Sequence, residues 1–317
     1  MINRIRGRGS LVRRLVAEAR FRRSERQGRT LVPYRPSTLD EVPAAAWREL
    51  HEKCGELALD RLLVTPGTWR ANARNGRWAE RARVMAFGDR AVGCWTDGED
   101  VGGAQTIANE DILAIDDRIV LLSGRLSFVG RGGSMTVAYN AVARTLVGEN
   151  IRQLRRERAG PDLPTSPGFV WLGAGDRERP ASDLPYKWAY LLRHGDSLSL
   201  NPQENVKIAV GDVVETGLSH GPATGIAVLS ARELVVAAEP ADSLQASRYG
   251  VDLTVAPRRY LRDVGWNRGQ LQIRLRTNDP QAEAAGEATD DLAIRRPLDK
   301  LLFEAMRRSF GNEIAWS

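Results

Sequence analysis

The stretch from Arg81 to Arg158 restricts the fold of this chain more than any other part of the sequence. It contains short apolar runs bounded by Gly, Asp, Asn or Ser. The runs are Val84–Phe87, Ala91–Trp95, Thr106–Ala108, Ile112–Ile115, Ile119–Leu122, Leu126–Val129 and Met135–Tyr139. Strands of this length between turn residues are typical of an antiparallel sheet that curls on itself. We therefore expect about seven strands, with Gly88–Arg90 as the first hairpin turn.

The hydrophobic period changes after these runs. Four apolar residues fall on one helical face, namely Leu146, Val147, Ile151 and Leu154. Four arginines fall on the other face, namely Arg152, Arg155, Arg156 and Arg158. This spacing predicts one amphipathic helix that closes the series of strands.

A second series of short, β-branched runs extends from Val206 to Arg276. In its last run, LQIRLR, the residues Leu271, Ile273 and Leu275 alternate with polar residues. Alternation with a period of two predicts a strand that buries one face and exposes the other. The strand rhythm of the first half is therefore repeated in the second half.

A helix is expected after the second series as well, over Arg296–Phe310, with Pro297 in its first turn and Gly311 beyond its end. Each half then has a strand pair, an extended loop, a central strand, a hairpin and a closing helix. The central strands, TIANEDILAI and TVAPRRYLRDV, correspond with an offset of one residue. This common order predicts two related domains rather than one long β fold.

Short strands closed by one helix resemble a pleckstrin-homology-like (PH-like) barrel of the bacterial or GRAM type. The resemblance rests on strand and helix order and covers about a quarter of the chain, the Arg81 to Arg158 stretch. It implies an α+β fold of mostly antiparallel β structure, with two PH-like small barrels, each closed by a C-terminal helix, after a helical N-terminal region. It also implies binding of proteins, peptides or phosphoinositides rather than catalysis.

Shifts in composition divide the chain into five expected segments. They are a basic amphipathic arm at residues 1–29, a Pro-rich linker and helical region at 30–78, a first PH-like domain at 79–158, a linker at 159–185 and a second PH-like domain at 186–317. Within the second segment, Thr38–Glu41 fits a capping box that starts a helix. The apolar spacing from Ala44 to Leu63 predicts an amphipathic helix that can break at Gly55.

Composition limits the classes of function. Cys54 and Cys94 are the only cysteines and the chain has three histidines, so we expect no disulfide framework, no metal site and no cofactor. The two cysteines are predicted to be small buried residues. No apolar run reaches the roughly 20 residues that span a bilayer, and no signal peptide is recognisable. These features predict a soluble cytoplasmic protein, either free, peripheral to a membrane or part of a particle.

Positive charge is concentrated at the N-terminus. The chain has a net charge of +6, whereas residues 1–29 hold ten arginines and two glutamates, so the remainder carries a net charge of −2. The arginines expected to contact an anionic surface are Arg4, Arg6, Arg8, Arg13, Arg14, Arg20, Arg22 and Arg23. Leu11, Val12, Leu15, Val16 and Ala19 form an apolar stripe in the same segment. The segment suits an anionic membrane, nucleic-acid phosphates or a neighbouring subunit, and a solvated terminus has the same composition.

One short motif suggests an enzyme. The segment LLRHGDS, Leu191 to Ser197, resembles the histidine phosphatase signature. That resemblance implies His194 as the nucleophile that accepts a phosphoryl group and Arg193 as a phosphate clamp. The later histidine is His220, in a Gly- and Pro-rich segment, and alternating strands and helices are missing nearby. A turn at His194 to Asp196 is the alternative reading of the same residues.

The sequence therefore favours a non-enzymatic binding or scaffold protein. Its PH-like domains are expected to bind protein, because the loops between their first two strands, Gly88–Arg90 and Ser230–Arg232, lack the Lys/Arg cluster that a lipid headgroup requires. The basic N-terminal segment is expected to act as the attachment device. Two alternatives stay open at this point: a structural subunit of a larger assembly, such as a phage-derived particle, and a histidine-phosphatase-like enzyme.

Overall fold

The computed structural model describes residues 32–66, 68–72, 76–98, 103–159, 170–171, 207–210, 225–240, 250–277, 291–297 and 300–317. The chain divides into two compact units. Among the described residues, the N-terminal unit comprises those up to Ile112 and from Ile119 to Arg158, and the C-terminal unit combines Leu113–Arg118 with the residues from Ala159 to Ser317. Both units are α+β with mostly antiparallel strands, which confirms the predicted class.

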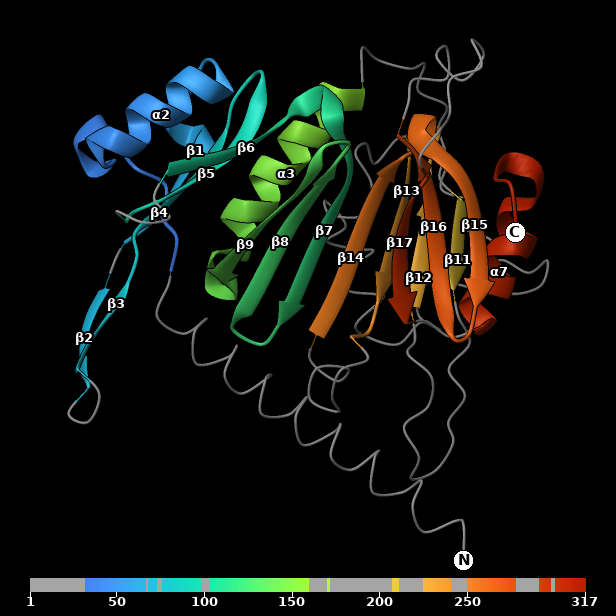
Figure 1. Ribbon diagram of the computed structural model, residues 1–317. Helices are drawn as coiled ribbons and strands as arrows, with labels where there is room; N and C mark the ends of the chain where they lie inside the picture. The colour runs from blue at the N-terminus through green and yellow to red at the C-terminus, as the bar shows by residue number, and fades with distance from the viewer. Residues whose placement is uncertain are drawn as a thin grey trace, which may run out of the picture. The chain divides into compact units, whose positions relative to one another are not determined.

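Among its described residues, the N-terminal unit contains a four-stranded sheet, the strands β7, β8 and β9, and the helices α2 and α3 (Figure 1). Its first sheet has the order β1-β4-β5-β6, and β7, β8 and β9 follow as a second antiparallel meander. The elements are α2 (Ala44–Cys54), β1 (Leu62–Thr65), β2 (Thr68–Asn72), β3 (Gly76–Glu80), β4 (Arg83–Phe87), β5 (Ala91–Thr96), β6 (Gly103–Ala108), β7 (Ile112–Val120), β8 (Ser123–Gly130), β9 (Gly133–Asn140) and α3 (Arg144–Ala159). Among the described residues, strands β2 and β3 form a two-stranded sheet of their own.

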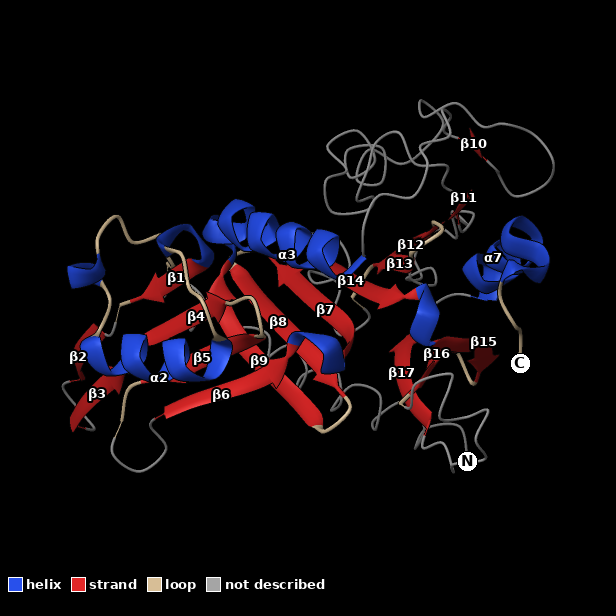
Figure 2. Ribbon diagram, turned by 90° about the horizontal axis from the view of Figure 1, so that it is seen from above, coloured by secondary structure: helices blue, strands red, loops and turns tan. Residues whose placement is uncertain are grey.

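Helix α2 covers one face of the first sheet and contacts β4, β5 and β6 (Figure 2). Ala46, Leu50 and Cys54 recur every four residues and are fully buried in the core. The helix ends at Gly55, whose φ of +85° lies in the region that favours glycine. The prediction of a helix through Leu63 is therefore wrong beyond Cys54, because all four residues of Leu62–Thr65 are buried in β1.

The predicted capping box is present in altered form. Thr38 precedes a short 3₁₀ helix, Leu39–Glu41, but its side chain makes no capping hydrogen bond. The carboxylate of Glu41 instead accepts a hydrogen bond of 2.8 Å from the backbone N–H of Ser37. The returning half of a capping box therefore forms one residue earlier than the pattern predicts.

The second meander has one long strand where the sequence predicts two short ones. The runs Ile112–Ile115 and Ile119–Leu122 were expected to be two strands, but β7 continues from Ile112 to Val120 without a turn. The side chains of Asp116 and Arg118, which belong to the C-terminal unit, have polar partners within that unit. Asp116 accepts a hydrogen bond from Thr254 and pairs with Arg296, and Arg118 pairs with Asp252.

Helix α3 lies beside β7, β8 and β9 in both views (Figures 1 and 2). Val147, Ile151 and Leu154 are buried as the helical period predicts. Arg155 was placed on the polar face but is only 3% exposed, so that part of the prediction is wrong. The buried face of α3 therefore includes Arg155 as well as the apolar residues, because an arginine with polar partners can also be buried.

A buried arginine connects α3 to the start of the first sheet. Arg61, just before β1, donates two hydrogen bonds to the carboxylate of Glu157, at 2.5 and 3.1 Å. Gln153, one turn earlier in α3, donates to the same carboxylate at 3.1 Å. The Arg61 side chain is 10% exposed, so the pair is partly shielded from solvent. The two parallel hydrogen bonds fix the orientation of the guanidinium relative to the Glu157 carboxylate.

The C-terminal unit repeats the pattern of a strand meander, a second meander and a helix. Its elements are β10 (Val170–Trp171), β11 (Lys207–Val210), β12 (Gly225–Leu229), β13 (Glu233–Ala238), β14 (Gly250–Pro257), β15 (Leu261–Asn267), β16 (Gln270–Arg276), β17 (Asp291–Pro297) and α7 (Lys300–Phe310). Strands β10 to β14 are neighbours in chain order, and β15-β16-β17 form a second sheet. Leu271, Ile273 and Leu275 in β16 are fully buried, which confirms the predicted alternation.

The last helix starts later than the sequence indicates. The residues Asp291–Pro297 form β17, which pairs with β16, and α7 begins at Lys300. Pro297 therefore ends a strand instead of starting a helix. Leu302, Ala305 and Met306 are buried as expected, whereas Leu301 is 36% exposed.

The two units share one backbone plan. In each, a strand that comes earlier in the chain pairs antiparallel with the first strand of the meander, β1 with β4 and β11 with β12. A four-residue turn follows that strand in the same register, Gly88–Ala91 in one unit and Ser230–Glu233 in the other. A 3₁₀ helix then leads into the second meander. In the register of the two ladders Pro257 corresponds to Ala108, and each of these residues directly precedes the 3₁₀ helix.

The sheets of the described residues are open, so the expectation of closed barrels is not met. In the N-terminal unit no hydrogen-bonded ladder among these residues joins β6 to β9. The chain leaves β6 through the 3₁₀ helix Asn109–Asp111, which redirects it into the second meander. The two meanders therefore belong to separate sheets, in which β6 and β9 are edge strands.

A matched pair of leucine substitutions tests the position of α2. Leu50→Ala should lower the free energy of unfolding of the N-terminal unit by about 2–5 kcal/mol, because Leu50 is fully buried in the core under the helix. Leu39→Ala, at a leucine that is 49% exposed, should change it by about 0.5 kcal/mol or less. Urea unfolding followed by hydrogen exchange in residues 83–96 measures both. Equal effects would mean that α2 does not cover this sheet.

Candidate functional site

The residues that the sequence singles out for function lie outside the described residues. This holds for the eight arginines Arg4, Arg6, Arg8, Arg13, Arg14, Arg20, Arg22 and Arg23, and for Arg193 and His194 of the phosphatase-like motif. The described parts of the chain offer three other features. They are the two turns that a headgroup-binding domain leaves open, a cavity beside β6, and a hollow at the start of α2.

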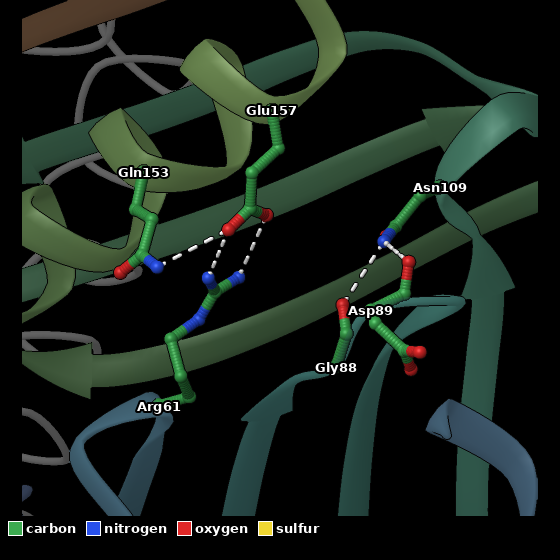
Figure 3. A network of polar contacts seen from close by, with 6 residues as sticks. All are labelled: Arg61, Gly88, Asp89, Asn109, Gln153 and Glu157. Atoms are coloured by element: carbon green, nitrogen blue, oxygen red, sulfur yellow. Dashed lines mark hydrogen bonds and ion pairs between the residues drawn. The ribbon is translucent and has the colours of Figure 1, made fainter. Parts of the chain in front are cut away.

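Asn109 forms hydrogen bonds with the turn Gly88–Arg90 (Figure 3). The side-chain amide of Asn109 donates to the carbonyl oxygens of Gly88 and Asp89, at 3.0 and 2.9 Å. The backbone N–H of Asn109 donates to the carbonyl of Arg90 at 2.8 Å. One residue therefore satisfies the three carbonyls of the turn.

Residues at the end of α2 and just after it also form hydrogen bonds with this turn. The backbone N–H of Arg90 donates to the Cys54 carbonyl at 3.1 Å, and the guanidinium of Arg90 donates to the Glu52 carbonyl at 3.2 Å. Asp89 accepts a hydrogen bond of 2.8 Å from the N–H of Glu56. A side chain at Gly88 would place its Cβ 2.2 Å from the Cys54 carbonyl oxygen, so the close approach requires glycine here.

Different side chains form hydrogen bonds with the corresponding turn of the C-terminal unit, Ser230–Arg232. The Ser230 hydroxyl accepts hydrogen bonds of 3.1 Å from the N–H groups of Arg232 and Glu233. The N–H of Arg258 donates to the Arg232 carbonyl at 2.7 Å, as Asn109 does to Arg90. The guanidinium of Arg258 also reaches the Ser230 carbonyl at 3.4 Å.

These bonds decide what the two turns can do. A phosphate-binding loop offers free backbone N–H groups and basic side chains to the ligand. In the first turn the N–H groups of Gly88 and Arg90 already donate to Ala91 and Cys54, and in the second the N–H groups of Arg232 and Glu233 donate to Ser230. Both turns are therefore structural corners of their units.

A cavity of about 430 Å³ lies between β6 and the β8–β9 hairpin. It is lined by Gln105, Thr106, Ile107, Ala108, Asp111, Gly130, Gly132, Gly133, Ser134 and Met135. Among these residues Asp111 alone is ionisable, and Arg131 lies 3.6 Å from its carboxylate. The cavity thus combines a strand edge, a glycine-rich hairpin and little charge, within the size range of about 300–1,000 Å³ that ligand sites have.

A second, more open hollow lies at the start of α2. Its lining includes the acidic residues Asp40, Glu41 and Glu52, and the aromatic pair Trp47 and His51, whose ring centroids are 5.5 Å apart. His51 is exposed, whereas Cys54 three residues later is fully buried, so the two do not present a common metal site. No group of three or more His, Cys, Asp or Glu side chains in the described ranges could hold a metal ion.

Both cysteines are buried, as the sequence predicts. Burial raises the pKa of the Cys54 thiol from its ordinary 9.0 to about 11, although Lys53 and Arg90 oppose this. Burial raises the pKa of Cys94 to about 11 as well, against the opposing charge of Arg83 and a hydrogen bond with Thr96. Because the thiolate is the reactive form, neither thiol is suited to nucleophilic chemistry near neutral pH.

Comparisons with known proteins identify no relative. No protein-family model, no curated protein and no solved structure matches the chain. Within the described residues, no helix has the length and apolar character needed to cross a membrane.

Sequence reasoning missed the two features that define the described surface. Asn109 lies in an unremarkable NED tripeptide, and only its position after a strand and before a 3₁₀ helix could have suggested a capping role. Gly130, Gly132 and Gly133 lie at the hairpin between β8 and β9. What the sequence did not show is that this hairpin faces the edge of β6 across a cavity.

Replacing the donor in the first turn should loosen it. Asn109→Asp removes the amide that donates to two carbonyls and places negative charge beside them, which should lower the stability of the N-terminal unit by about 2–3 kcal/mol. The exposed Asn267→Asp makes the same chemical change and should have an effect below about 0.5 kcal/mol. Thermal unfolding and hydrogen exchange of residues 88–91 distinguish the two variants. A harmless Asn109→Asp would show that the turn holds itself closed.

The raised thiol pKa values predict a loss of stability in alkali. Below pH 9 both thiols are protonated in the folded and unfolded chain, so they contribute no pH dependence. Between pH 9 and pH 11 they ionise in the unfolded chain only, which should lower the free energy of unfolding by about 2–4 kcal/mol in total. Urea unfolding across this range should show a steeper decline for the natural chain than for the Cys54→Ala, Cys94→Ala double variant. Parallel curves would refute the assignment.

Proposed function

We propose that this chain is a non-enzymatic binding or scaffold protein. Its two units act as divergent PH-like modules that bind protein, and less readily a lipid headgroup. The Arg-rich segment of residues 1–29 attaches the chain to an anionic surface or partner. No cofactor or metal enters this function.

The order of elements supports the PH-like part of the proposal. Each unit has a first meander of three strands, β4–β6 or β12–β14, and a second meander of three strands, β7–β9 or β15–β17. A helix follows each second meander, α3 or α7. This order resembles that of a PH-like domain without barrel closure. Additional strands lie at the edge of each first sheet, β1 in the N-terminal unit and β11 and β10 in the C-terminal unit.

The hydrogen bonds within the two turns favour protein over a lipid headgroup as the ligand class. A headgroup-binding module needs the turn between its first two strands to be open and basic, because phosphate oxygens are recognised by free N–H groups and by Lys or Arg. Here the N–H groups of Gly88, Arg90, Ser230 and Arg232 already donate to acceptors within the same unit. Phosphate recognition at these turns would break these bonds, whereas protein binding at another surface leaves them intact.

The charge distribution supports electrostatic attachment through residues 1–29. That segment carries a net charge of +8 on a chain whose remainder carries −2. Arginines form charge-assisted, bidentate bonds with phosphate and carboxylate groups. The segment can therefore bind an anionic surface without a folded pocket, and salt screening should weaken that attachment.

Two sets of charge variants separate attachment through the arm from headgroup binding at the turns. Replacing Arg4, Arg6, Arg8, Arg13, Arg14, Arg20, Arg22 and Arg23 by Gln should abolish binding to vesicles with 30% anionic lipid or to duplex DNA, whichever the natural chain binds. For the natural chain, affinity should fall on the order of 10³-fold between 50 and 200 mM salt, as expected for about six phosphate contacts. The turn variants Arg90→Gln and Arg232→Gln should bind as the natural chain does.

The opposite pattern would overturn the proposal. If Arg90→Gln or Arg232→Gln removes vesicle binding while the eight-arginine variant retains it, the units are headgroup-binding modules. If neither surface is bound at any salt concentration, the arm contacts protein alone and the electrostatic attachment to lipid or nucleic acid is wrong.

A further inference from the structure

We propose that the edge of β6 binds an extended, uncharged segment of a partner protein as an added strand. This inference rests on the proposed protein-binding function and assigns it a surface. The surface, called the β6 edge below, is formed by Thr106 and Ala108 together with the cavity between β6 and the β8–β9 hairpin.

The direction of the backbone groups in β6 follows from Ala104. The N–H of Ala104 donates to the Glu49 carboxylate at 2.9 Å, and its carbonyl accepts from the Lys53 ammonium at 2.9 Å. Both groups therefore point away from β5. Because the direction alternates along an antiparallel strand, the N–H and C=O of Thr106 and the N–H of Ala108 also point away from β5.

The two ends of the β6 edge differ in whether their outward backbone groups have hydrogen-bond partners. Side chains of α2 cover the polar groups of Ala104, but the described residues provide no hydrogen-bond partner for the outward N–H and C=O of Thr106 or the outward N–H of Ala108. Unpaired groups along a strand edge are a template for another strand. An incoming segment can therefore pair from Thr106 onward and must end before Ala104.

The far wall of the cavity has room for the side chains of such a segment. A Cβ placed on Gly132 or Gly133 would meet no atom within 4 Å, whereas one on Gly130 would lie 2.9 Å from Ile107. The hairpin therefore approaches β6 closely at Gly130 and leaves space beyond it. Since the carboxylate of Asp111 is paired with Arg131, the lining favours an uncharged guest.

The C-terminal unit shows the same kind of edge with a strand on it. Strand β14 occupies the position of β6 in that unit, and its neighbour there is the segment Leu113–Arg118. Side chains secure the pairing, including the hydrogen bond from Thr254 to Asp116. An extended segment is therefore a compatible occupant of this edge in the common backbone plan.

A partner peptide fits the β6 edge better than a second copy of this chain. Two copies paired through β6 would each bring Lys53 and Glu49 of α2 against the partner strand, where these side chains already cover Ala104. A separate extended segment can end before it reaches the Lys53 and Glu49 side chains that cover Ala104. It would gain main-chain hydrogen bonds to Thr106 and Ala108, with side-chain selectivity supplied by the cavity.

The test uses the full chain and peptides selected against it from a random ten-residue display library. Thr106→Pro removes the outward N–H without removing a β5–β6 hydrogen bond, since proline is tolerated at such an edge position. It should weaken the selected peptides at least about tenfold, the equivalent of one lost hydrogen bond. Thr106→Val keeps both backbone groups and a β-branched side chain, and should change affinity less than about twofold.

Hydrogen exchange provides a second readout that does not depend on the proline variant. In the free natural chain, the amides of Thr106 and Ala108 should exchange faster than those of Gln105 and Ile107, and bound peptide should protect Thr106. Peptide affinity should be nearly the same at 50 and 500 mM salt, because the guest is uncharged.

Each other outcome overturns the inference in a distinguishable way. Selected peptides that bind Thr106→Pro as well as the natural chain leave protein binding standing and remove the β6 edge. A dimer that Thr106→Pro dissociates assigns the edge to a second copy. A selection that yields no binder, from a chain that still binds vesicles or DNA, removes both the edge and the protein-binding role of the units.

Discussion

The structure depends on one backbone hydrogen bond that occurs once in each unit. The first residue of the 3₁₀ helix donates its N–H to the carbonyl of the last turn residue, from Asn109 to Arg90 and from Arg258 to Arg232. This bond fixes the point at which the chain leaves the first meander and enters the second. In both units it ties the last residue of the turn to the 3₁₀ helix that starts the crossing.

The crossing also explains why the units remain open sheets. A chain that left β6 in line with the strand could pair its next strand with the same sheet, but the 3₁₀ helix Asn109–Asp111 redirects it into a separate sheet. The edge of β6 then stays unpaired apart from the end covered by Glu49 and Lys53. The same constraint that closes the turn to phosphate therefore leaves a strand edge for protein, which is the physical basis of the proposed function.

The two units keep this plan with different side chains. In the first, a side-chain amide donates to turn carbonyls, and in the second a hydroxyl accepts from turn N–H groups. Either solution satisfies the turn, because a buried corner requires that its polar groups be bonded and does not prescribe the donor. Sequence identity between the halves is weak for this reason, while register and element order are common to both.

Local patterns in the sequence determined the class of the fold, most strands and the buried faces of the helices. The alternation in β16 and the helical spacing of Leu50 and Cys54 are properties of neighbouring residues, so they could be read without coordinates. The continuity of β7 through Asp116, the strand β1 in place of a longer helix, and the burial of Arg155 could not. Each depends on a partner distant in sequence that satisfies a polar group or covers an apolar one. Only the tertiary structure brought Asn109 to the first turn and the glycine hairpin to the β6 edge, because a hydrogen bond or a cavity between remote segments leaves no periodic trace in the sequence.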